Sequence, residues 1–178
     1  MTDSGTRIKR SHVGRSAVTP IGPASVRSDG AMTVEIAVSA VLEATPEEVW
    51  AALEHIETHV EWMADAESIR FVSSARKGVG AEFECTTRIG PIRLVDVMSV
   101  TEWHPGAAMG VAHRGVVKGQ GRFVLEGLGC GQTQLSWRER LAFPWWLGGV
   151  FGEFVAKPIL ERIWRGNLRR LGTLVVDA

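Results

Sequence analysis

The 178-residue chain contains no tyrosine, has only two cysteines and carries no net charge, because 20 basic residues balance 20 acidic ones. Cys85 and Cys130 lie far apart, with no spacing that suggests a partner, so we expect a reducing, cytoplasmic environment. Balanced charge gives no overall field for nucleic acid, and no nucleic-acid partner is expected. Apolar residues make up 45% of the chain, enough for the core of one domain.

Long apolar runs are also lacking. The longest uncharged stretch near the carboxyl-terminal end, residues 141–152, is too short to span a bilayer and contains Pro144 and three glycines. The amino-terminal residues lack the apolar core typical of a signal peptide. We therefore expect no transmembrane segment, and composition leaves the oligomeric state open.

The amino-terminal region differs from the rest of the chain. Residues 1–31 are rich in Ser, Gly, Pro, Arg and Thr and show no hydrophobic periodicity, which predicts a flexible tail. From Met32 the pattern changes to that of a folded domain, 32–178. Apolar residues then alternate with less apolar ones, as in a half-buried strand: Val34, Ile36, Val38, Ala40 and Leu42.

Two short helical segments are expected after this first strand. Thr45 is suited to cap a helix, Pro46 to occupy its first turn, and Glu48 to complete a capping box. The pattern breaks near Thr58, and a second short helical turn is predicted over residues 59–63.

About six further strands follow, separated by short turns rich in glycine and proline. The predicted strands span residues 68–74, 81–89, 92–103, 108–117, 121–128 and 132–143. Short turns between consecutive strands favour an antiparallel sheet over alternating strand–helix–strand units.

The last segment, from about residue 144 to 176, has the period of a long amphipathic helix. Its apolar residues recur at steps of three and four: Leu160, Trp164, Leu168, Leu171 and Val175. Pro158 removes one helical hydrogen bond, which predicts either a kink or a separate short helix before it. So long an amphipathic helix needs a broad partner, and a curved sheet wrapped around it would provide one.

The order and spacing of these segments resemble the SRPBCC superfamily, which includes START-like proteins and the polyketide cyclase/dehydrase group. The resemblance covers about residues 32–176. The matching features are the strand at 34–43, ATPEEVWAAL at 44–53, Trp62, VTEWHPG at 100–106, the strand at 132–141 and the terminal helix with Pro158.

The resemblance implies an α+β helix-grip fold. In that fold a curved antiparallel sheet of about seven strands wraps around the long C-terminal helix. It also implies a cavity between sheet and helix that takes a small hydrophobic or amphipathic molecule, lipid-like or polyketide-like. It implies no shared catalytic residues, and no cofactor is expected.

Glu139 is the most unusual residue on the predicted inner face. Strand alternation places it on the same side as Trp137 and Leu141. A carboxylate there is costly unless it is paired or protonated. It is therefore either a ligand anchor or proton carrier, or a group paired with Arg122 or His113, or a group at the open mouth.

The same alternation gives the other inward-facing positions, with Asp96 as an awkward polar member of its strand. Aromatic residues of the helical segments are expected to roof the cavity. The candidate ligand-binding residues are Trp62, Phe83, Thr87, Met98, Met109, His113, Phe123, Trp137, Glu139, Trp146, Phe151 and Phe154.

Three functions remain open. The first is binding of a small hydrophobic ligand without catalysis. The second is a polyketide cyclase- or dehydratase-like reaction in which Glu139 or His113 moves protons, although His113 is alternatively a satisfied, partly buried histidine. The lack of tyrosine removes the phenol that often orients a polyketide ring. The third is a protein-interaction role.

A metal site is not expected. His55 and His59 are four residues apart, but Ile56 stands where a zinc protease motif needs glutamate. The break near Thr58 also separates the two side chains, and a solvated helix end is the alternative for both.

Overall fold

The computed structural model describes residues 32–144 and 149–177, with the backbone alone at residue 32 and at 149–156. The predicted tail, 1–31, therefore lies outside the described residues. The elements are, in order, β1 (Met32–Leu42), α1 (Pro46–Leu53), the 3-10 helix η1 (Ile56–Glu61), β2 (Ala66–Phe71), β3 (Glu82–Ile89), β4 (Ile92–His104), β5 (Ala108–Arg114), β6 (Lys118–Gly129), β7 (Gln132–Phe143) and α2 (Gly149–Val176).

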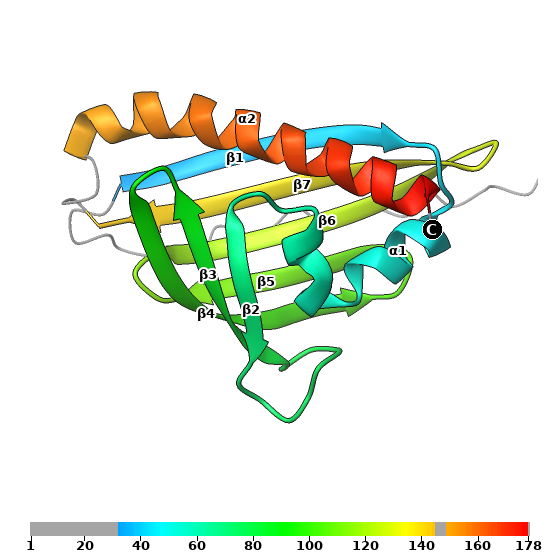
Figure 1. Ribbon diagram of the computed structural model, residues 1–178, viewed down its shortest axis with the longest axis horizontal. Helices are drawn as coiled ribbons and strands as arrows, with labels where there is room; N and C mark the ends of the chain where they lie inside the picture. The colour runs from blue at the N-terminus through cyan, green and yellow to red at the C-terminus, as the bar shows by residue number, and fades with distance from the viewer. Residues whose placement is uncertain (1–31, 145–148, 178) are drawn as a thin grey trace, which may run out of the picture.

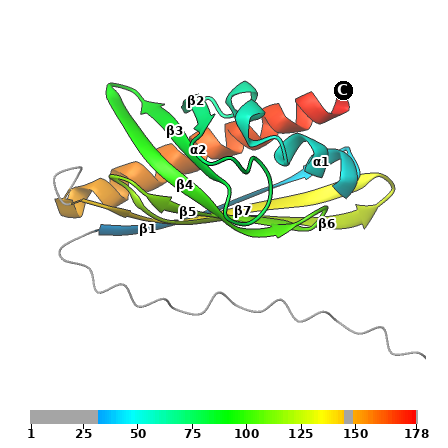
Figure 2. The ribbon, with the colours of Figure 1, turned by 90° about the horizontal axis from the view of Figure 1, so that it is seen from below.

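The strands form one antiparallel sheet in the order β1-β7-β6-β5-β4-β3-β2. Helix α2 lies along one face of this sheet beside β1 (Figure 1). In the second view, β2, β3 and β4 rise out of the plane in which β1, β5, β6 and β7 lie (Figure 2). The predicted α+β helix-grip architecture is confirmed, including two short helices after the first strand.

The core forms where the alternating strands meet the helix stripe. On β1, Val34, Ile36 and Val38 are buried and the residues between them are exposed. The predicted stripe of α2 is buried against the sheet through Leu160, Trp164, Leu168 and Leu171. Burial of each fully buried aliphatic side chain stabilises the folded state by about 1.5–3 kcal/mol. This shared burial holds the long helix across the sheet.

The predicted capping box starts α1. The backbone N–H of Thr45 donates to Glu48 Oε2 at 2.8 Å, and the N–H of Glu48 donates to Thr45 Oγ1 at 3.3 Å. The hydrogen bond from the Thr45 backbone, followed by that from its hydroxyl, lowers the pKa of Glu48. Local chemistry alone therefore fixes where this helix begins.

Strand β6 begins three residues earlier than predicted, at Lys118. Gly119 lies in the strand although it precedes the predicted start, and both Gly119 and Gly121 pair with β7. A side chain on Gly119 would collide with the backbone of Arg140. Glycine is used here because another backbone approaches closely, and not because the chain turns.

Helix α2 runs without interruption through Pro158. The alternative of a separate short first helix is therefore wrong, because the helical bonds on both sides of the proline persist and only one is removed. Among the described residues, no helix is long and apolar enough to cross a membrane.

Candidate functional site

A cavity lies between the inner face of the sheet and the face of α2 that packs on it, with η1 closing one side. About 1000 Å³ of space in it and at its mouth is free of protein atoms, a volume that includes open solvent. Its described lining is mostly apolar. Eight of the predicted ligand-binding residues line it, which are Phe83, Thr87, Met98, Met109, His113, Phe123, Trp137 and Glu139.

Trp62 is not part of the lining, contrary to expectation. Its side chain is only 1% exposed and packs against the rings of His59, Phe123 and Trp137. It lies directly after η1, where the chain turns toward α2, and its carbonyl accepts a hydrogen bond from Arg170 Nε at 2.9 Å. Trp62 therefore supports the cavity wall from behind.

Three predicted residues cannot be placed. Trp146 lies outside the described residues. Phe151 and Phe154 belong to the first turns of α2, where the structure describes the backbone alone.

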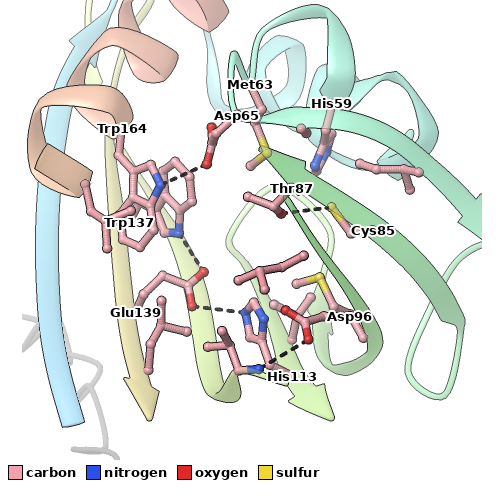
Figure 3. A pocket seen from close by; sticks show the side chains of 18 of the residues that line it. His59, Met63, Asp65, Cys85, Thr87, Asp96, His113, Trp137, Glu139 and Trp164 are labelled. Atoms are coloured by element: carbon pink, nitrogen blue, oxygen red, sulfur yellow. Dashed lines mark hydrogen bonds and ion pairs between the residues drawn. The ribbon is translucent and has the colours of Figure 1, made fainter. Parts of the chain in front are cut away.

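A buried carboxylate–imidazole pair lies inside the cavity. Glu139 Oε2 on β7 is 3.3 Å from His113 Nε2 on β5, and the two side chains are 6% and 14% exposed (Figure 3). Trp137 Nε1 donates to the other carboxylate oxygen, Oε1, at 2.9 Å. Of the partners predicted for Glu139, His113 is the correct one, because Arg122 points to the opposite face and pairs with Glu102.

The pair is incompletely satisfied. Among the described residues, neither Glu139 Oε2 nor His113 Nε2 has a hydrogen-bond partner of good geometry. Buried polar groups are nearly always hydrogen-bonded, so a buried pair whose facing atoms lie 3.3 Å apart without a good hydrogen bond needs an explanation. A ligand that supplies a donor or an acceptor would satisfy them.

Gly121 makes room for this pair. It lies on β6 opposite Glu139 in the register of the two strands. A Cβ atom at position 121 would be 2.6 Å from Glu139 Oε2. The carboxylate therefore folds over β6 toward His113 on the next strand. Sequence reasoning did not find this role, although two glycines spaced by one residue in a strand are a signal for close approach.

Asp96 on β4 is a second carboxylate in the lining, as its alternation predicted. It is 8% exposed, and its Oδ1 accepts from the backbone N–H of Val117 at 3.3 Å. A Cβ atom on Gly115 would be 2.8 Å from Asp96 Cα. Both inner carboxylates are thus accommodated by a glycine.

Asp65 and Asn167 join the segment after η1 to α2, and sequence reasoning missed both. Asn167 Nδ2 donates to Asp65 Oδ1 at 2.7 Å, and Trp164 Nε1 donates to Asp65 Oδ2 at 3.4 Å. The side-chain oxygen of Asn167 accepts from Ala64 N at 3.1 Å. Asn167 is fully buried, and a polar residue inside the apolar stripe was the available signal.

Comparison with known proteins agrees with the fold. The sequence profile of the family described as polyketide cyclase/dehydrase and lipid transport matches residues 33–176. The chain belongs to this family. The resemblance to SRPBCC proteins predicted from the sequence is thereby confirmed.

Solved structures of similar fold come from several bacteria. A protein from Thermus thermophilus is 16% identical with a TM-score of 0.68, covering 80% of this chain and 97% of that one. The Zhui aromatase/cyclase from Streptomyces sp. R1128 is 12% identical with a TM-score of 0.66, covering 81% and 94%. A START superfamily protein from Mycobacterium smegmatis is 12% identical with a TM-score of 0.68, covering 80% and 97%. No curated protein matches significantly. At these identities the likeness shows the fold.

In this member of the polyketide cyclase/dehydrase and lipid transport family, His59 is buried in the cavity wall. Its Nε2 donates to the carbonyl of Leu53 at 2.8 Å, and burial lowers its pKa to about 4. The interpretation of His59 as a solvated helix end is therefore wrong, whereas the side chain of His55 is half exposed. Within the described residues, no three His, Cys, Asp or Glu side chains are grouped as metal ligands.

Cys85 also lines the cavity of this family member. Burial raises the pKa of its thiol to about 11, and its Sγ lies 3.8 Å from Thr87 Oγ1. A thiol with so high a pKa is a poor nucleophile at neutral pH. The polar chemistry available in the cavity therefore comes from its carboxyl, imidazole and hydroxyl groups.

Proposed function

We propose that the protein binds a small hydrophobic or amphipathic molecule in the cavity between the sheet and α2. The observation that carries this proposal is an apolar cavity containing a buried pair, Glu139 and His113, whose facing atoms lie 3.3 Å apart without a hydrogen bond of good geometry. Ligand sites have this composition, in which apolar walls give affinity and a few polar groups give orientation.

The apolar lining provides the affinity in this proposal. A ligand that buries about 300 Å² of apolar surface gains about 7 kcal/mol, before the entropic cost of association. A ligand group that satisfies an otherwise unpaired buried atom avoids a penalty of about 1–3 kcal/mol. Shape would therefore set most of the affinity, and the polar pair would select among ligands of similar shape.

Titration of the full chain with Nile red, an uncharged apolar dye, tests the proposal. We expect saturable binding at one dye per chain, and native mass spectrometry of the purified protein would then detect any ligand retained from the cell. Thr87→Trp fills part of the cavity and is expected to weaken dye binding at least tenfold. Thr101→Trp makes the same change at an exposed position on β4 and serves as the control. Equal dye binding by both variants would reject the cavity as the site.

A second candidate function is proton transfer in a cyclase- or dehydratase-like reaction. It is favoured by one observation, the 3.3 Å separation of His113 Nε2 and Glu139 Oε2 inside the cavity. A positioned acid or base of this kind typically contributes 10²–10⁴-fold to a rate. With a poly-β-keto substrate, His113→Gln would lower turnover by about 10²–10⁴-fold. Turnover left unchanged by this substitution would exclude the role. A cytoplasmic location also stays a prediction.

A further inference from the structure

The charged groups that line the cavity are almost all of one sign. Among the described residues, the lining contains three carboxyl groups, those of Asp65, Asp96 and Glu139, and no lysine or arginine. The sequence of residues 145–156 contains no lysine or arginine either. The basic residues of α2 that the structure describes, such as Arg165 and Arg169, are exposed.

The two imidazoles of the lining do not balance these carboxyl groups. Burial lowers the pKa of His59 to about 4, so its ring is neutral at physiological pH, and its Nε2 is used by the Leu53 carbonyl. His113 lies 3.3 Å from Glu139 and offsets at most one carboxylate. Three carboxyl groups therefore face at most one cationic ring.

The carboxyl groups differ in how well the protein satisfies them. Asp65 accepts hydrogen bonds from Asn167 and Trp164, both on α2, so both of its carboxylate oxygens already have donors. Glu139 is only 6% exposed, and its Oε2 faces His113 Nε2 at 3.3 Å without a hydrogen bond of good geometry. Asp96 accepts from Val117 N through Oδ1. Figure 3 shows Glu139 and Asp96 on either side of His113, at the end of the cavity away from Asp65.

This arrangement defines the polar part of the ligand. A buried carboxylate that is incompletely hydrogen-bonded gains from a further donor, and a cationic donor gains most because charges interact strongly in a cavity that excludes water. An anionic group placed at the same end would meet like charge and would find no lysine or arginine among the described lining residues.

We propose that the cavity selects amphipathic molecules whose polar end is a cationic amine, held by Glu139 and Asp96, and that it rejects the corresponding carboxylates. This inference rests on the proposed function, because it names the class of ligand for the same cavity. It predicts an order of affinity, amine above alcohol above carboxylate, for ligands that share one apolar group.

Isothermal titration calorimetry of the full chain at pH 7 with decylamine, 1-decanol and decanoate tests this order. The three probes share one alkyl chain and differ only in the polar end. We expect decylamine to bind at least tenfold more tightly than decanoate, with 1-decanol between them. Decanoate binding as tightly as decylamine would overturn the inference and leave the proposed function standing. If none of the three binds, both are rejected.

Two substitutions locate the selectivity. Glu139→Gln and Asp96→Asn keep the shape of each side chain and remove its charge, and each is expected to reduce the decylamine-to-decanoate affinity ratio at least threefold. Affinity for 1-decanol should change less than twofold, which also shows that the variant is folded. Glu84→Gln removes the same charge from the outer face of β3 and should leave the ratio unchanged. An equal loss in this control, or an unchanged ratio in both cavity variants, would assign the selectivity to the surface.

Discussion

Two cross-strand acid–base pairs on opposite faces of the sheet, Arg122–Glu102 and His113–Glu139, are built differently. On the outer face Arg122 donates to both carboxylate oxygens of Glu102, at 2.6 and 2.8 Å. On the inner face Glu139 and His113 are 3.3 Å apart, and the facing atoms make no hydrogen bond within the described structure. The outer pair is about a quarter exposed, whereas the inner one is almost fully buried.

A glycine on a neighbouring strand makes room for the side chains of each pair, so the two pairs share the same backbone setting. Gly110 lies between Glu102 and Arg122 in the strand register, and Gly121 lies opposite Glu139. The outer pair is complete in itself and behaves as a structural contact. The facing atoms of the inner pair make no good hydrogen bond although they are buried, where an unsatisfied polar atom costs the most free energy. This favours a role in ligand binding. Three experiments test this difference.

The largest expected effect is the loss of stability in acid that arises from His59, which closes the inner cavity from η1. His59 has a folded pKa of about 4, below its ordinary 6.5, because of burial. The unfolded chain therefore binds more protons between these values, and stability falls as the pH falls from about 7 to 4. The loss is about 3 kcal/mol in the free energy of unfolding. Urea denaturation at several pH values measures it.

His59→Gln is expected to flatten this pH dependence, because the amide still donates to the Leu53 carbonyl and does not titrate. His55→Gln, at a half-exposed position four residues earlier, is the control and should keep the full dependence. The outer pair contributes in a lower window. Arg122 lowers the pKa of Glu102, so that its contribution is lost only as the pH falls below the ordinary 4.5. An unchanged slope in His59→Gln would contradict this assignment.

The second effect separates the two glycines. Gly121→Ala is expected to destabilise the protein by about 2 kcal/mol, because the new methyl group overlaps the carboxylate of Glu139. Gly110→Ala should cost less than about 1 kcal/mol, since its nearest neighbour, Glu102 Cβ, is 3.0 Å away on the open outer face. Urea denaturation of each variant gives the two values.

A double-mutant cycle identifies the cause. If the cost of Gly121→Ala arises from Glu139, the same change made in a Glu139→Ala background should cost less than half as much. Additive effects would show that the glycine is required for its backbone instead.

Strand alternation was sufficient to place Glu139, Asp96 and His113 on one face of the sheet. The period of two is a property of the extended backbone, so it survives any tertiary arrangement. The predicted apolar stripe of α2 is buried as expected because the period of 3.6 is likewise a property of the helical backbone. Neither pattern states which strands are neighbours, so the pairing of Glu139 with His113 instead of Arg122 needed the structure.

Other parts of the site were not readable from local pattern. Asp65 and Asn167 contact each other although they are 102 residues apart; the position of Asn167 inside the apolar stripe marks it as unusual but does not identify Asp65 as its partner. Trp62 follows a 3-10 helix, whose short turns do not fix a face toward the sheet, and the prediction that it lines the cavity was wrong. Contacts that depend on how a loop meets a helix are set by tertiary packing.

The smallest expected effect is a difference between Glu102→Gln and Glu139→Gln, one of which should change stability and the other ligand selectivity. Glu102→Gln should lower the free energy of unfolding by about 1 kcal/mol or less, because an exposed pair is screened by water and salt, and it should leave ligand binding unchanged. Glu139→Gln should leave stability unchanged or raise it by up to about 1 kcal/mol. The substitution removes a desolvated charge, and the amide oxygen still accepts from Trp137.

Ligand selectivity should respond in the opposite sense, changing in Glu139→Gln and not in Glu102→Gln. Urea denaturation and the alkyl-probe titrations, carried out on the same two preparations, measure both quantities. A marked loss of stability in Glu139→Gln with unchanged selectivity would make the inner pair a structural contact like the outer one. Unchanged or raised stability with altered selectivity would show that Glu139 serves ligand binding at a cost in the free energy of unfolding.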